Sequence, residues 1–381
     1  MKHYDYIFAG AGLASLMTIY KMILSKKIED KTILLIDNDN KKNNDRTWCF
    51  WEKPGHNWSK IVSKSWQTAF FVNENSIRSF EMKPYEYNMI RGLDFYNLVF
   101  DLIEKQPNII FVNDKVISYH DDSSQVAVIC ESQNYSCGKL FNSIYDKNLV
   151  INQKKFPVLQ QHFVGWFIKS EQAVFDPQIA TFMDFSIPQN GNTKFMYVLP
   201  TSTTEALLEP TLFSHKHLKR EEYELEINNY AKKLGIKNFE ILEKERGSIP
   251  MTSYPFWKNN YTNILNIGTA GGWTKASTGF TFYHTNKKSD QLIAFLDTNQ
   301  DFKKFHKKTK FWYYDLILLD VLDKQNELGS NIFSSLLMKG NTELIFKFLN
   351  EETNFLEDLK IMLKCPTIIF VKAFFRVLWN M

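Results

Sequence analysis

Hydrophobic positions at the start of the chain follow the pattern of a strand, a helix and a second strand. Residues 4–9 (YDYIFA) are apolar enough for a central parallel strand that is buried on both faces. In residues 13–24, apolar side chains recur every three or four positions, which is the spacing of one helix face. Residues 31–36 (KTILLI) form the second expected strand, and Asp37 ends it.

The middle of the chain alternates short β-like segments with turns, which predicts a mixed or antiparallel sheet. A helix is expected at residues 217–234, where apolar residues are spaced among many charges. Residues 263–296 read as a strand, a glycine turn and a helix. The tail from Asp301 onward is expected to be helical throughout. No internal repeat or low-complexity linker separates these parts.

Composition narrows the class of protein. A chain of 381 residues with 44% hydrophobic content is long enough for two domains, or for one large domain with an inserted sheet. The net charge of +4 is too slight for the strongly basic footprint of a nucleic-acid-binding protein, although a mildly basic surface suits an anionic membrane. The 32 Phe, 17 Tyr and 9 Trp indicate large apolar ligand surfaces or interfaces, or a bias toward Phe in the source genome.

Metal and disulfide chemistry find little support in the sequence. The cysteines have no zinc-site spacing, and a chain of this size needs no disulfide framework, so free cytosolic thiols are expected. His215 and His217 can share one face of a strand, but no carboxylate cluster accompanies them, and no metal site is predicted. Arg91 stands at an expected strand–helix junction, either near a cofactor phosphate or as an ordinary salt-bridged residue.

The C-terminal segment is apolar but interrupted by charge. Residues 365–381 read CPTIIFVKAFFRVLWNM, and Lys372 and Arg376 are too central for a membrane-spanning helix. The pattern suits a helix that either docks on the protein's own body or lies at a membrane surface. Residues 1–6 lead directly into a strand and show no signal-peptide pattern.

Two glycine clusters each follow an expected strand and precede an expected helix. In the first, Gly10 permits a tight turn, Gly12 lets a pyrophosphate approach the helix N-terminus, and Asp37 can accept a hydrogen bond from a ribose hydroxyl. Ser15 stands where the fingerprint has a third Gly or Ala, and it is small enough for close packing. The motif predicts a dinucleotide site, with an ordinary strand-to-helix turn as the alternative.

The second cluster favours FAD over NAD, because FAD is long and needs a second loop for its ribityl and flavin ends. Ser277 and Thr278 are expected to cap the following helix, whose N-terminus would favour an anionic reduced flavin. Thr269 stands where many flavoproteins have an Asp, so the ribityl contact is not predicted from that position. The glycines of this cluster are Gly268, Gly271, Gly272 and Gly279.

A polar, turn-forming loop at residues 43–55 carries an unusual run of aromatic residues. Trp48, Phe50 and Trp51 follow the sequence DRT at residues 45–47. Three large aromatic side chains in a loop either pack into the core or line a binding site, and the local pattern leaves both readings open.

Four segments together resemble the bacterial lycopene β-cyclases. They follow the first glycine motif in this order: DRTWCFW (45–51), FMYVLPTSTTEALLEPTLFS (195–214), ERGSIPMT (245–252) and GTAGGWTKASTGF (268–280). The similarity covers nearly the whole chain, and residues 320–381 are its least distinctive part. It implies an FAD-binding protein of the two-domain flavoprotein type that converts the linear ends of lycopene into β-rings without net oxidation.

The resemblance also implies a general acid. In the family, the acid lies in a short strand of the form apolar-apolar-Glu-acidic-Thr, and residues 207–211 (LLEPT) match it, so Glu209 is the predicted acid. Pro210 occupies the second acidic position, so two adjacent carboxylates are absent. Cyclisation needs a proton at C2 of the linear end, attack of the C5–C6 double bond on the C1 cation, and proton loss from C6. Apolar neighbours should raise the pKa of Glu209.

Further site residues follow from their place beside the first glycine motif. Arg46 and Thr47 are expected near the FAD. Trp48, Phe50 and Trp51 are expected where flavin meets the polyene, where ring faces can stabilise a carbocation, or else as core.

The resemblance implies an α/β fold with an FAD-binding Rossmann-type domain, in a two-domain, hydroxylase-like flavoprotein. A mixed or antiparallel β-sheet substrate domain is inserted, and a helical C-terminal tail follows. The FAD-binding domain is expected at residues 1–65, 85–155 and 255–300. The substrate-binding domain is expected at residues 66–84 and 156–254, and the C-terminal helical region at residues 301–381.

The expected active cofactor is reduced FAD, with NAD(P)H only as its reductant. The expected substrate is lycopene or a related linear carotenoid, and the expected location is the cytoplasm, peripherally associated with the membrane. Alternatives with the same fold are a flavin-dependent monooxygenase and an isoprenoid reductase, which would consume NADPH stoichiometrically. A further alternative is a non-catalytic prenyl- or lipid-binding protein, which would need neither flavin reduction nor Glu209.

Overall fold

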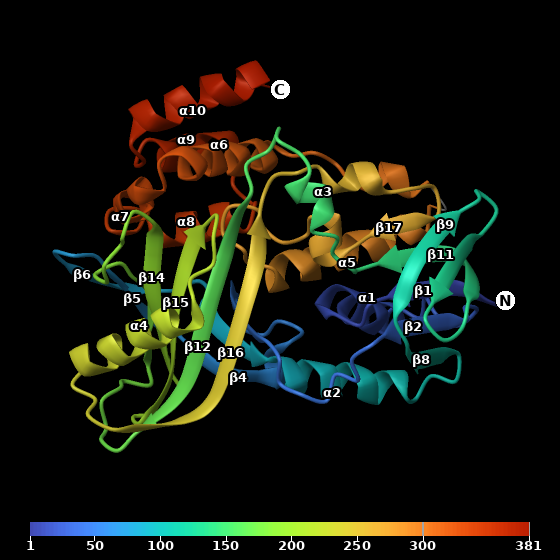
Figure 1. The fold of residues 1–381 in the computed structure, drawn as a ribbon, viewed down its shortest axis with the longest axis horizontal. Coiled ribbons are helices and arrows are strands. Elements are labelled where there is room, and N and C mark those ends of the chain that lie inside the picture. The colour runs from blue at the N-terminus through green and yellow to red at the C-terminus, as the bar shows by residue number, and fades with distance from the viewer. Residues whose placement is uncertain (299–300, 381) are drawn as a thin grey trace.

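The computed structural model describes residues 1–298 and 301–380, and its N-terminal part is a mainly parallel sheet (Figure 1). Residues 299–300 and 381, at which two of the expected domains end, lie outside the described residues. The strands of this sheet are β1 (Lys2–Ala9), β2 (Ile33–Asp37), β8 (Ile109–Asn113), β9 (Val116–Asp121), β10 (Val126–Cys130), β11 (Tyr135–Asn142) and β17 (Ile264–Asn266). Their order is β8-β2-β1-β11-β10-β9, and β17 pairs with β11.

The strand–helix–strand unit expected at the N-terminus is confirmed. Strands β8, β2, β1, β11 and β17 pair in parallel, whereas β9 and β10 are antiparallel additions. One face of the sheet shares a core with three helices: α1 (Leu13–Leu24), α2 (Gly92–Ile103) and α5 (Phe282–Leu296). Because the parallel strands β1 and β17 both lie beside β11, the glycine loops that follow them are brought to the same edge of the sheet.

A larger mixed sheet forms the other half of the molecule (Figure 1). Its strands are β5 (Thr68–Val72), β6 (Ile77–Glu81), β12 (Leu159–Ser170), β13 (Ile179–Asp184), β14 (Thr193–Pro200), β15 (Glu205–Ser214) and β16 (Phe239–Met251). The order is β16-β12-β15-β14-β13-β5-β6, and only the described pair β13–β5 is parallel. Helix α4 (Arg220–Lys233), the helix expected at 217–234, packs on one face through Ile227 and Tyr230.

A small sheet joins the two halves. It consists of β3 (Thr47–Glu52), β7 (Glu86–Arg91) and β4 (Val62–Trp66), in the order β3-β7-β4. The loop expected at residues 43–55 was therefore wrong in part, because residues 47–52 form a strand paired with β7. The reason is visible in the sequence: Trp48 and Phe50 alternate with Thr47 and Cys49, which is the period of a strand. A short helix, α3 (Asn148–Ile151), lies in the connection between β11 and β12.

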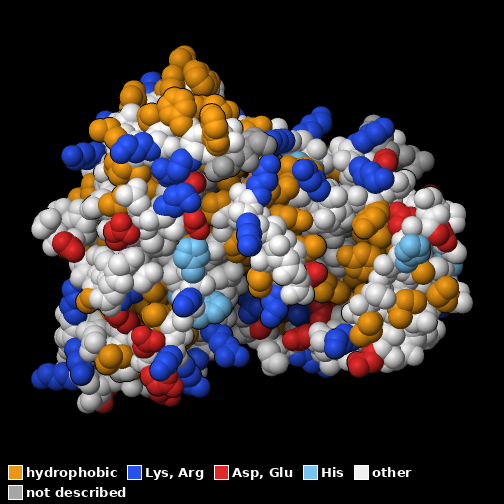
Figure 2. All heavy atoms as spheres, turned by 45° about the horizontal axis from the view of Figure 1, so that its top comes forward, with side chains coloured by type: hydrophobic (Ala, Val, Ile, Leu, Met, Phe, Trp, Pro, Cys, Tyr) orange, Lys and Arg blue, Asp and Glu red, His pale blue; other side chains and the backbone are white. Residues whose placement is uncertain are grey.

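The tail is helical, as expected, but broken into short helices. These are α6 (Lys310–Lys324), α7 (Gly329–Leu337), α8 (Thr342–Leu349), α9 (Phe355–Met362) and α10 (Thr367–Asn380). Helix α10 packs on α6 through Ala373 and through an ion pair from Arg376 to Asp320. Hydrophobic side chains gather on the outer surface at this end of the molecule (Figure 2). None of the helices that the structure describes is long and apolar enough to cross a membrane.

Candidate active site

Two carboxyl groups meet on the face of the large sheet that is turned toward the N-terminal half. Glu209 lies on β15, and Glu245 lies on β16, with β12 between them. The two side chains are hydrogen-bonded to each other and are only 8% and 9% exposed. Glu209 is thus buried, as expected from its apolar neighbours. Its carboxyl partner comes from a strand 36 residues later rather than from the adjacent position that Pro210 occupies.

Gly165 on β12 makes room for this pair. It stands opposite Glu245 in the register of β12 and β16. A Cβ at Gly165 would lie 2.8 Å from Leu207 Cδ1, 3.0 Å from Glu209 Oε2 and 3.0 Å from Glu245 Cγ. Real Cβ atoms essentially never approach to the shorter of these distances, so a side chain here would have to push the carboxyl groups or Leu207 aside. The glycine therefore permits the contact between the two acids.

Burial raises the pKa of Glu209 well above its usual range. The nearby charge of Glu245 and the hydrogen bond to it raise the pKa of Glu209 further. Burial also raises the pKa of Glu245, but the Thr47 hydroxyl and the charge of Arg91 oppose this rise. Since two carboxylates in contact cannot both ionise cheaply, each disfavours ionisation of the other, and the pKa of Glu209 is the one that is raised further.

The pair borders a cavity of about 90 Å³, the carboxyl cavity. Most of its wall is apolar or aromatic, including Tyr197 from β14 and Phe280 from the second glycine loop. It is lined by Thr47, Trp48, Cys49, Tyr87, Gln161, Phe163, Tyr197, Leu199, Leu207, Glu209, Glu245, Ile249, Gly279, Phe280, Thr281 and Phe282. A buried acid in such a wall can protonate an apolar double bond while water is largely excluded.

Thr47 and Arg91 support the carboxyl pair from the small sheet. Thr47 Oγ1 donates a 2.6 Å hydrogen bond to Glu245 Oε2. Arg91 pairs with Glu243 at 2.7 Å and lies 3.8 Å from the centre of the Phe167 ring. The structure thus places Arg91 in a salt bridge, which was one of its two expected roles. It also places Thr47 next to the acids, at the edge of the site expected to bind the cofactor.

The aromatic residues of β3 divide between the cavity and the core. Trp48 lines the carboxyl cavity and packs against Phe282. Phe50 stacks on Phe282 with ring centres 4.5 Å apart and is 1% exposed, so it lies in the core of the N-terminal half. Trp51 donates from Nε1 to the Phe346 carbonyl at 3.3 Å and packs in the core beneath α8. Of the three, only Trp48 borders the carboxyl cavity.

The first glycine loop has the geometry that its motif predicts. Gly10 has a φ of +90°, which a side chain would strain, and a Cβ at Gly12 would stand in open space. The carboxylate of Asp37 accepts a 2.6 Å hydrogen bond from the Ala11 N–H, so it lies beside the loop. Arg46, in contrast, is exposed, and its guanidinium donates to the Asp45 carbonyl.

The second glycine loop packs against the first helix. A Cβ at Gly268 would lie 3.0 Å from Ala14 Cβ of α1, and one at Gly271 would overlap the Asn266 carbonyl. Gly272 and Gly279 have φ values of +69° and +72°. The loop therefore depends on glycine at these positions, and it brings Gly279 to the wall of the carboxyl cavity.

The expected helix cap in this loop was wrong. Helix α5 begins after Thr281 rather than after Thr278, because residues 275–279 close a turn through hydrogen bonds from the N–H groups of Thr278 and Gly279 to Lys275. The Ser277 hydroxyl donates instead to Asp315 of α6 at 2.7 Å. The buried Thr278 Oγ1 has no hydrogen-bond partner among the residues that the structure describes.

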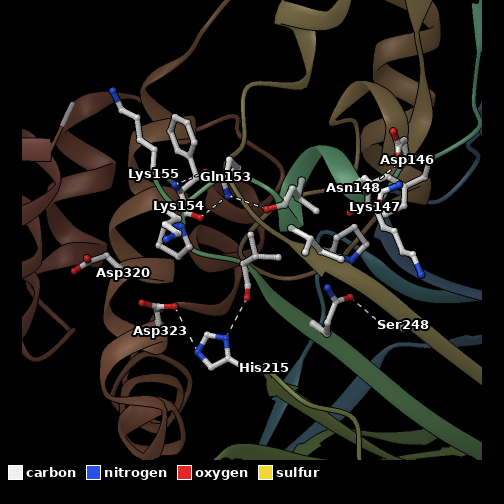
Figure 3. Close-up of a pocket in the computed structure, with 18 of the residues that line it drawn as sticks. Asp146, Lys147, Asn148, Gln153, Lys154, Lys155, His215, Ser248, Asp320 and Asp323 are labelled. Atoms are coloured by element: carbon white, nitrogen blue, oxygen red, sulfur yellow. Dashed lines mark hydrogen bonds and ion pairs between the residues drawn. The ribbon is translucent and has the colours of Figure 1, made fainter.

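A cavity of about 980 Å³ lies elsewhere, between the β11–β12 connection, the edge of the large sheet and α6 (Figure 3). His215 faces Asp323 there at 3.5 Å, and His217 is hydrogen-bonded to Ser248 at 2.8 Å. Neither Glu209 nor Glu245 lines this space. Within residues 1–298 and 301–380, no group of three or more His, Cys, Asp or Glu side chains is placed to hold a metal ion.

Comparison with known proteins identifies the family. The model of the family described as "Lycopene cyclase protein" matches residues 5–375. The chain belongs to the lycopene cyclase family. Among curated proteins, a lycopene beta-cyclase from Pantoea ananas is 25% identical over 311 residues, which cover 77% of this chain and 74% of the relative. A lycopene beta-cyclase from a Paracoccus strain is 24% identical over 180 residues, covering 45% of this chain and 46% of the relative.

Solved structures show the fold of this lycopene cyclase family member. A geranylgeranyl bacteriochlorophyll reductase-like protein from Thermoplasma acidophilum matches with a TM-score of 0.60 at 11% identity, covering 99% of this chain and 100% of the other. A p-nitrophenol 4-monooxygenase from Pseudomonas putida matches with a TM-score of 0.57 at 11% identity, over 98% of each chain. The halogenase PltM, solved with FAD, matches 90% of this chain and 78% of its own with a TM-score of 0.57 at 10% identity. The fold is that of FAD-dependent flavoproteins, as expected.

Three residues at or near the carboxyl cavity and the second glycine loop were not singled out from the sequence. Glu245 opens the segment ERGSIPMT, which carried the resemblance, but nothing local shows that β16 lies two strands from β15. Gly165 is a single glycine inside a strand, which is a known sign of close approach. Lys275 is buried in the second glycine loop between Asp315 at 2.9 Å and Glu351 at 3.0 Å, and no local pattern indicates it.

Proposed function

We propose that this protein is a lycopene β-cyclase that closes the linear ends of lycopene, or of a related carotenoid, into β-rings with no net oxidation. The observation that carries the proposal is the buried Glu209–Glu245 pair at the wall of an aromatic cavity, where burial raises the pKa of Glu209. Membership of the lycopene cyclase family supports the substrate class. The same pair has no evident use in a hydroxylation or a reduction, the reactions expected of the alternatives with the same fold.

Glu209 is proposed as the acid that protonates C2. A C1 cation then forms, the C5–C6 double bond attacks it to make the C1–C6 bond, and a proton leaves C6. After donation, both carboxyl groups would carry negative charge at one apolar wall, and their repulsion makes the pair a strong base. The pair can therefore recover a proton from C6, so protons and electrons balance over the cycle.

The aromatic wall is proposed to stabilise the cation. Tyr87, Tyr197, Trp48 and Phe280 line the carboxyl cavity, and ring faces attract a positive charge. The buried wall also keeps water away from the cation, which would otherwise be trapped as an alcohol. Trp48 is the residue of the β3 aromatic run for which this role is best supported, whereas Phe50 and Trp51 pack mainly as core.

FAD is the proposed cofactor, and the residues fit it. Gly10, Gly12 and Asp37 form the pyrophosphate and ribose end, and the open space beside Gly12 leaves room for phosphate oxygens. Near the carboxyl cavity, Gln161 Oε1 and Thr278 Oγ1 are buried without partners within the described part of the chain, and a flavin ring edge has polar groups that would satisfy them.

The second glycine loop, with Gly268, Gly271, Gly272 and Gly279, is proposed to hold the flavin end. When bound and reduced, FAD supplies negative charge that stabilises a nearby cation. Arg46 and Thr47 are proposed at the edge of this site, where the guanidinium of Arg46 is exposed and bonds to Asp45, its neighbour in the sequence. NAD(P)H is proposed only as the reductant. The protein is proposed to act in the cytoplasm at the membrane surface, where its substrate is dissolved.

Pigment analysis tests the proposal. Cells that accumulate lycopene, and that express this protein, are expected to form carotenoids with β-rings. The Glu209→Gln variant should keep the yellow flavin but form no rings. The matched control is Glu205→Gln, at the half-buried start of the same strand, where the carboxylate pairs with Lys169. Unchanged lycopene with the wild-type flavoprotein present would refute the function, and stoichiometric NADPH consumption would favour a reductase or monooxygenase.

A further inference from the structure

Apolar cavities lie in a row between Glu209 and the surface at α8 and α9. Tyr197 and Phe280 line both the carboxyl cavity and a second space of about 30 Å³, the middle cavity. Leu336 and Ile345 line both the middle cavity and a third space of about 380 Å³, the surface cavity. Each neighbouring pair of cavities therefore has two side chains of its walls in common. The row connects the carboxyl pair with the C-terminal helices.

The walls of the row suit a hydrocarbon. Apart from Thr278, the side chains that line the middle cavity are all hydrophobic. Leu and Ile make up most of the lining of the surface cavity, and its polar lining residues are Asn341, Lys360 and Lys364. Leu363, which is 74% exposed, also lines it, so the surface cavity opens where α9 ends. A linear apolar molecule would meet almost no polar wall between this opening and Glu209.

The surface around the opening is apolar. Helix α10 uses one face to pack on α6, and its other face is open to solvent. Trp379 is 92% exposed, and the other exposed apolar side chains of α9, α10 and their connection are Phe355, Leu356, Leu359, Leu363, Ile368, Val371, Phe374, Phe375 and Leu378. They form part of the hydrophobic surface at the top of Figure 2, where Lys and Arg side chains border it. An exposed apolar surface of this extent marks an interaction site.

The charges around this surface favour a lipid bilayer. From Leu359 to Met381, the sequence carries Lys360, Lys364, Lys372 and Arg376 and no Asp or Glu. Apolar side chains that insert below the headgroups, with lysines at their edge, are the pattern of a helix lying in an anionic membrane interface. A protein partner would need matching acidic and apolar groups, whereas a bilayer supplies both in one plane.

We propose that the exposed apolar face of α9 and α10 lies in a lipid bilayer, and that a linear carotenoid passes from the bilayer through the surface and middle cavities to Glu209. The inference rests on the proposed function. The inner gate, between the surface and middle cavities, consists of Leu336 and Ile345. A second gate, between the middle cavity and the carboxyl cavity, consists of Tyr197 and Phe280. On this route, these four side chains would have to change rotamer to join the three cavities.

Vesicle binding tests the surface. The wild type should sediment with phosphatidylglycerol-containing vesicles, and Phe374→Glu combined with Phe375→Glu should weaken this at least tenfold. Leu225→Glu, an exposed leucine on α4, is the matched control and should bind as the wild type does. Unchanged binding by the double variant overturns the surface assignment. A second outcome also overturns the surface assignment: neither protein binds vesicles, the wild type is a dimer and the double variant is a monomer. The surface would then be an interface between two copies of the chain.

A larger and a smaller side chain at Leu336, in the inner gate, test the route. With diphenylhexatriene as an apolar probe and no vesicles present, Leu336→Trp should reduce bound fluorescence at least fivefold, and Leu336→Ala should increase it. Leu242→Trp, on the exposed surface of β16, should match the wild type. Ring formation from vesicle-embedded lycopene should likewise be slower in Leu336→Trp and faster in Leu336→Ala than in the wild type. The flavin absorbance should be the same in all of these proteins.

The outcomes separate the two proposals. If Glu209→Gln is inactive while both Leu336 variants keep wild-type probe binding and ring formation, the route is wrong and the function stands. If the wild type binds vesicles and the probe, and the Leu336 variants respond as expected, yet lycopene is never cyclised, the function is wrong and the route stands.

Discussion

Replacing Gly165 with Ala tests how the acid is kept protonated. The added Cβ would stand 2.8 Å from Leu207 Cδ1 and 3.0 Å from Glu209 Oε2 and Glu245 Cγ, so it would separate the two carboxyl groups. Overpacking of this kind costs about 1–3 kcal/mol in the free energy of unfolding. Loss of a hydrogen bond to a charged group costs about 1.5–3 kcal/mol, and because this bond stabilises the protonated form of Glu209, its loss lowers the pKa of Glu209.

The direction of the pH effect follows from the raised pKa of Glu209. The acid is active when protonated, so ring formation falls as the pH rises through that pKa. When Gly165→Ala separates the acids, the pKa falls, and the alkaline limb of the rate profile should move to lower pH. Rates of ring formation with reduced FAD, measured from neutral to alkaline pH, check this.

Thermal unfolding separates this effect from simple damage to the fold. Gly138→Ala is the matched control, because its Cβ would lie 3.2 Å from the Asp5 carbonyl in the other sheet, far from both acids. The only expected effect of the control is a lower unfolding temperature. The alkaline limb of its rate profile should lie at the same pH as that of the wild type. A Gly165→Ala protein that is destabilised but keeps the wild-type limb, or moves it to higher pH, would refute the reasoning.

Further predictions concern the groups that support the site. Lys275→Ala leaves Asp315 without its buried partner, and the free energy of unfolding measured in urea should fall by about 3–5 kcal/mol; a loss within error would contradict the structural role. Burial and the charge of Glu352 raise the pKa of Glu52 to about 7, so folding favours its protonated form and stability falls as the pH rises toward and through 7. Glu52→Gln should therefore raise the unfolding temperature at pH 8 and have little effect at pH 5, and an equal effect at both would refute the assignment. Phe50→Ala should lower the unfolding free energy by about 3–5 kcal/mol through lost core packing, as urea denaturation will show; a protein as stable as the wild type would argue against a core position.

Much of the fold could be predicted because its signals are local. Hydrophobic periodicity, or glycines that mark a turn, can be seen within a short window of sequence for three parts of the fold: the βαβ unit, helix α4 and the late strand–glycine–helix segment. Pairing is not local: nothing within residues 68–81 shows which strands β5 and β6 pair with, and only the resemblance, which puts residues 66–84 in the substrate-binding domain, anticipated that they belong with the large sheet. The β3 strand was read as a loop because its polar flanks at residues 43–46 and 53–57 outweighed the short alternation between them.

The residues of the candidate site could likewise be predicted only where their signal is local. Glu209 could be found from the resemblance, and its burial followed from its neighbours. Glu245 could not, because its relation to Glu209 depends on the order β16-β12-β15 and on the missing side chain of Gly165. The cap assigned to Ser277 and Thr278 failed because a hydroxyl near a helix start is also free to bond a distant partner, here Asp315.

The most direct test of the central claim is the fate of the proton. Lycopene is cyclised by the purified protein with chemically reduced FAD in deuterated water, and the β-ring products are examined by mass spectrometry and NMR. The protein is equilibrated in deuterated water and used in excess over the linear ends, so that each Glu209–Glu245 pair closes one ring and is deuterated when it does so. Proton delivery to C2 then predicts one deuterium per ring at C2, and no rings formed by Glu209→Gln. A parallel reaction in ordinary water with deuterated NADPH as the reductant should place no deuterium in the ring. Rings without solvent deuterium, or rings formed by Glu209→Gln at the wild-type rate, would contradict the claim that Glu209 supplies the proton.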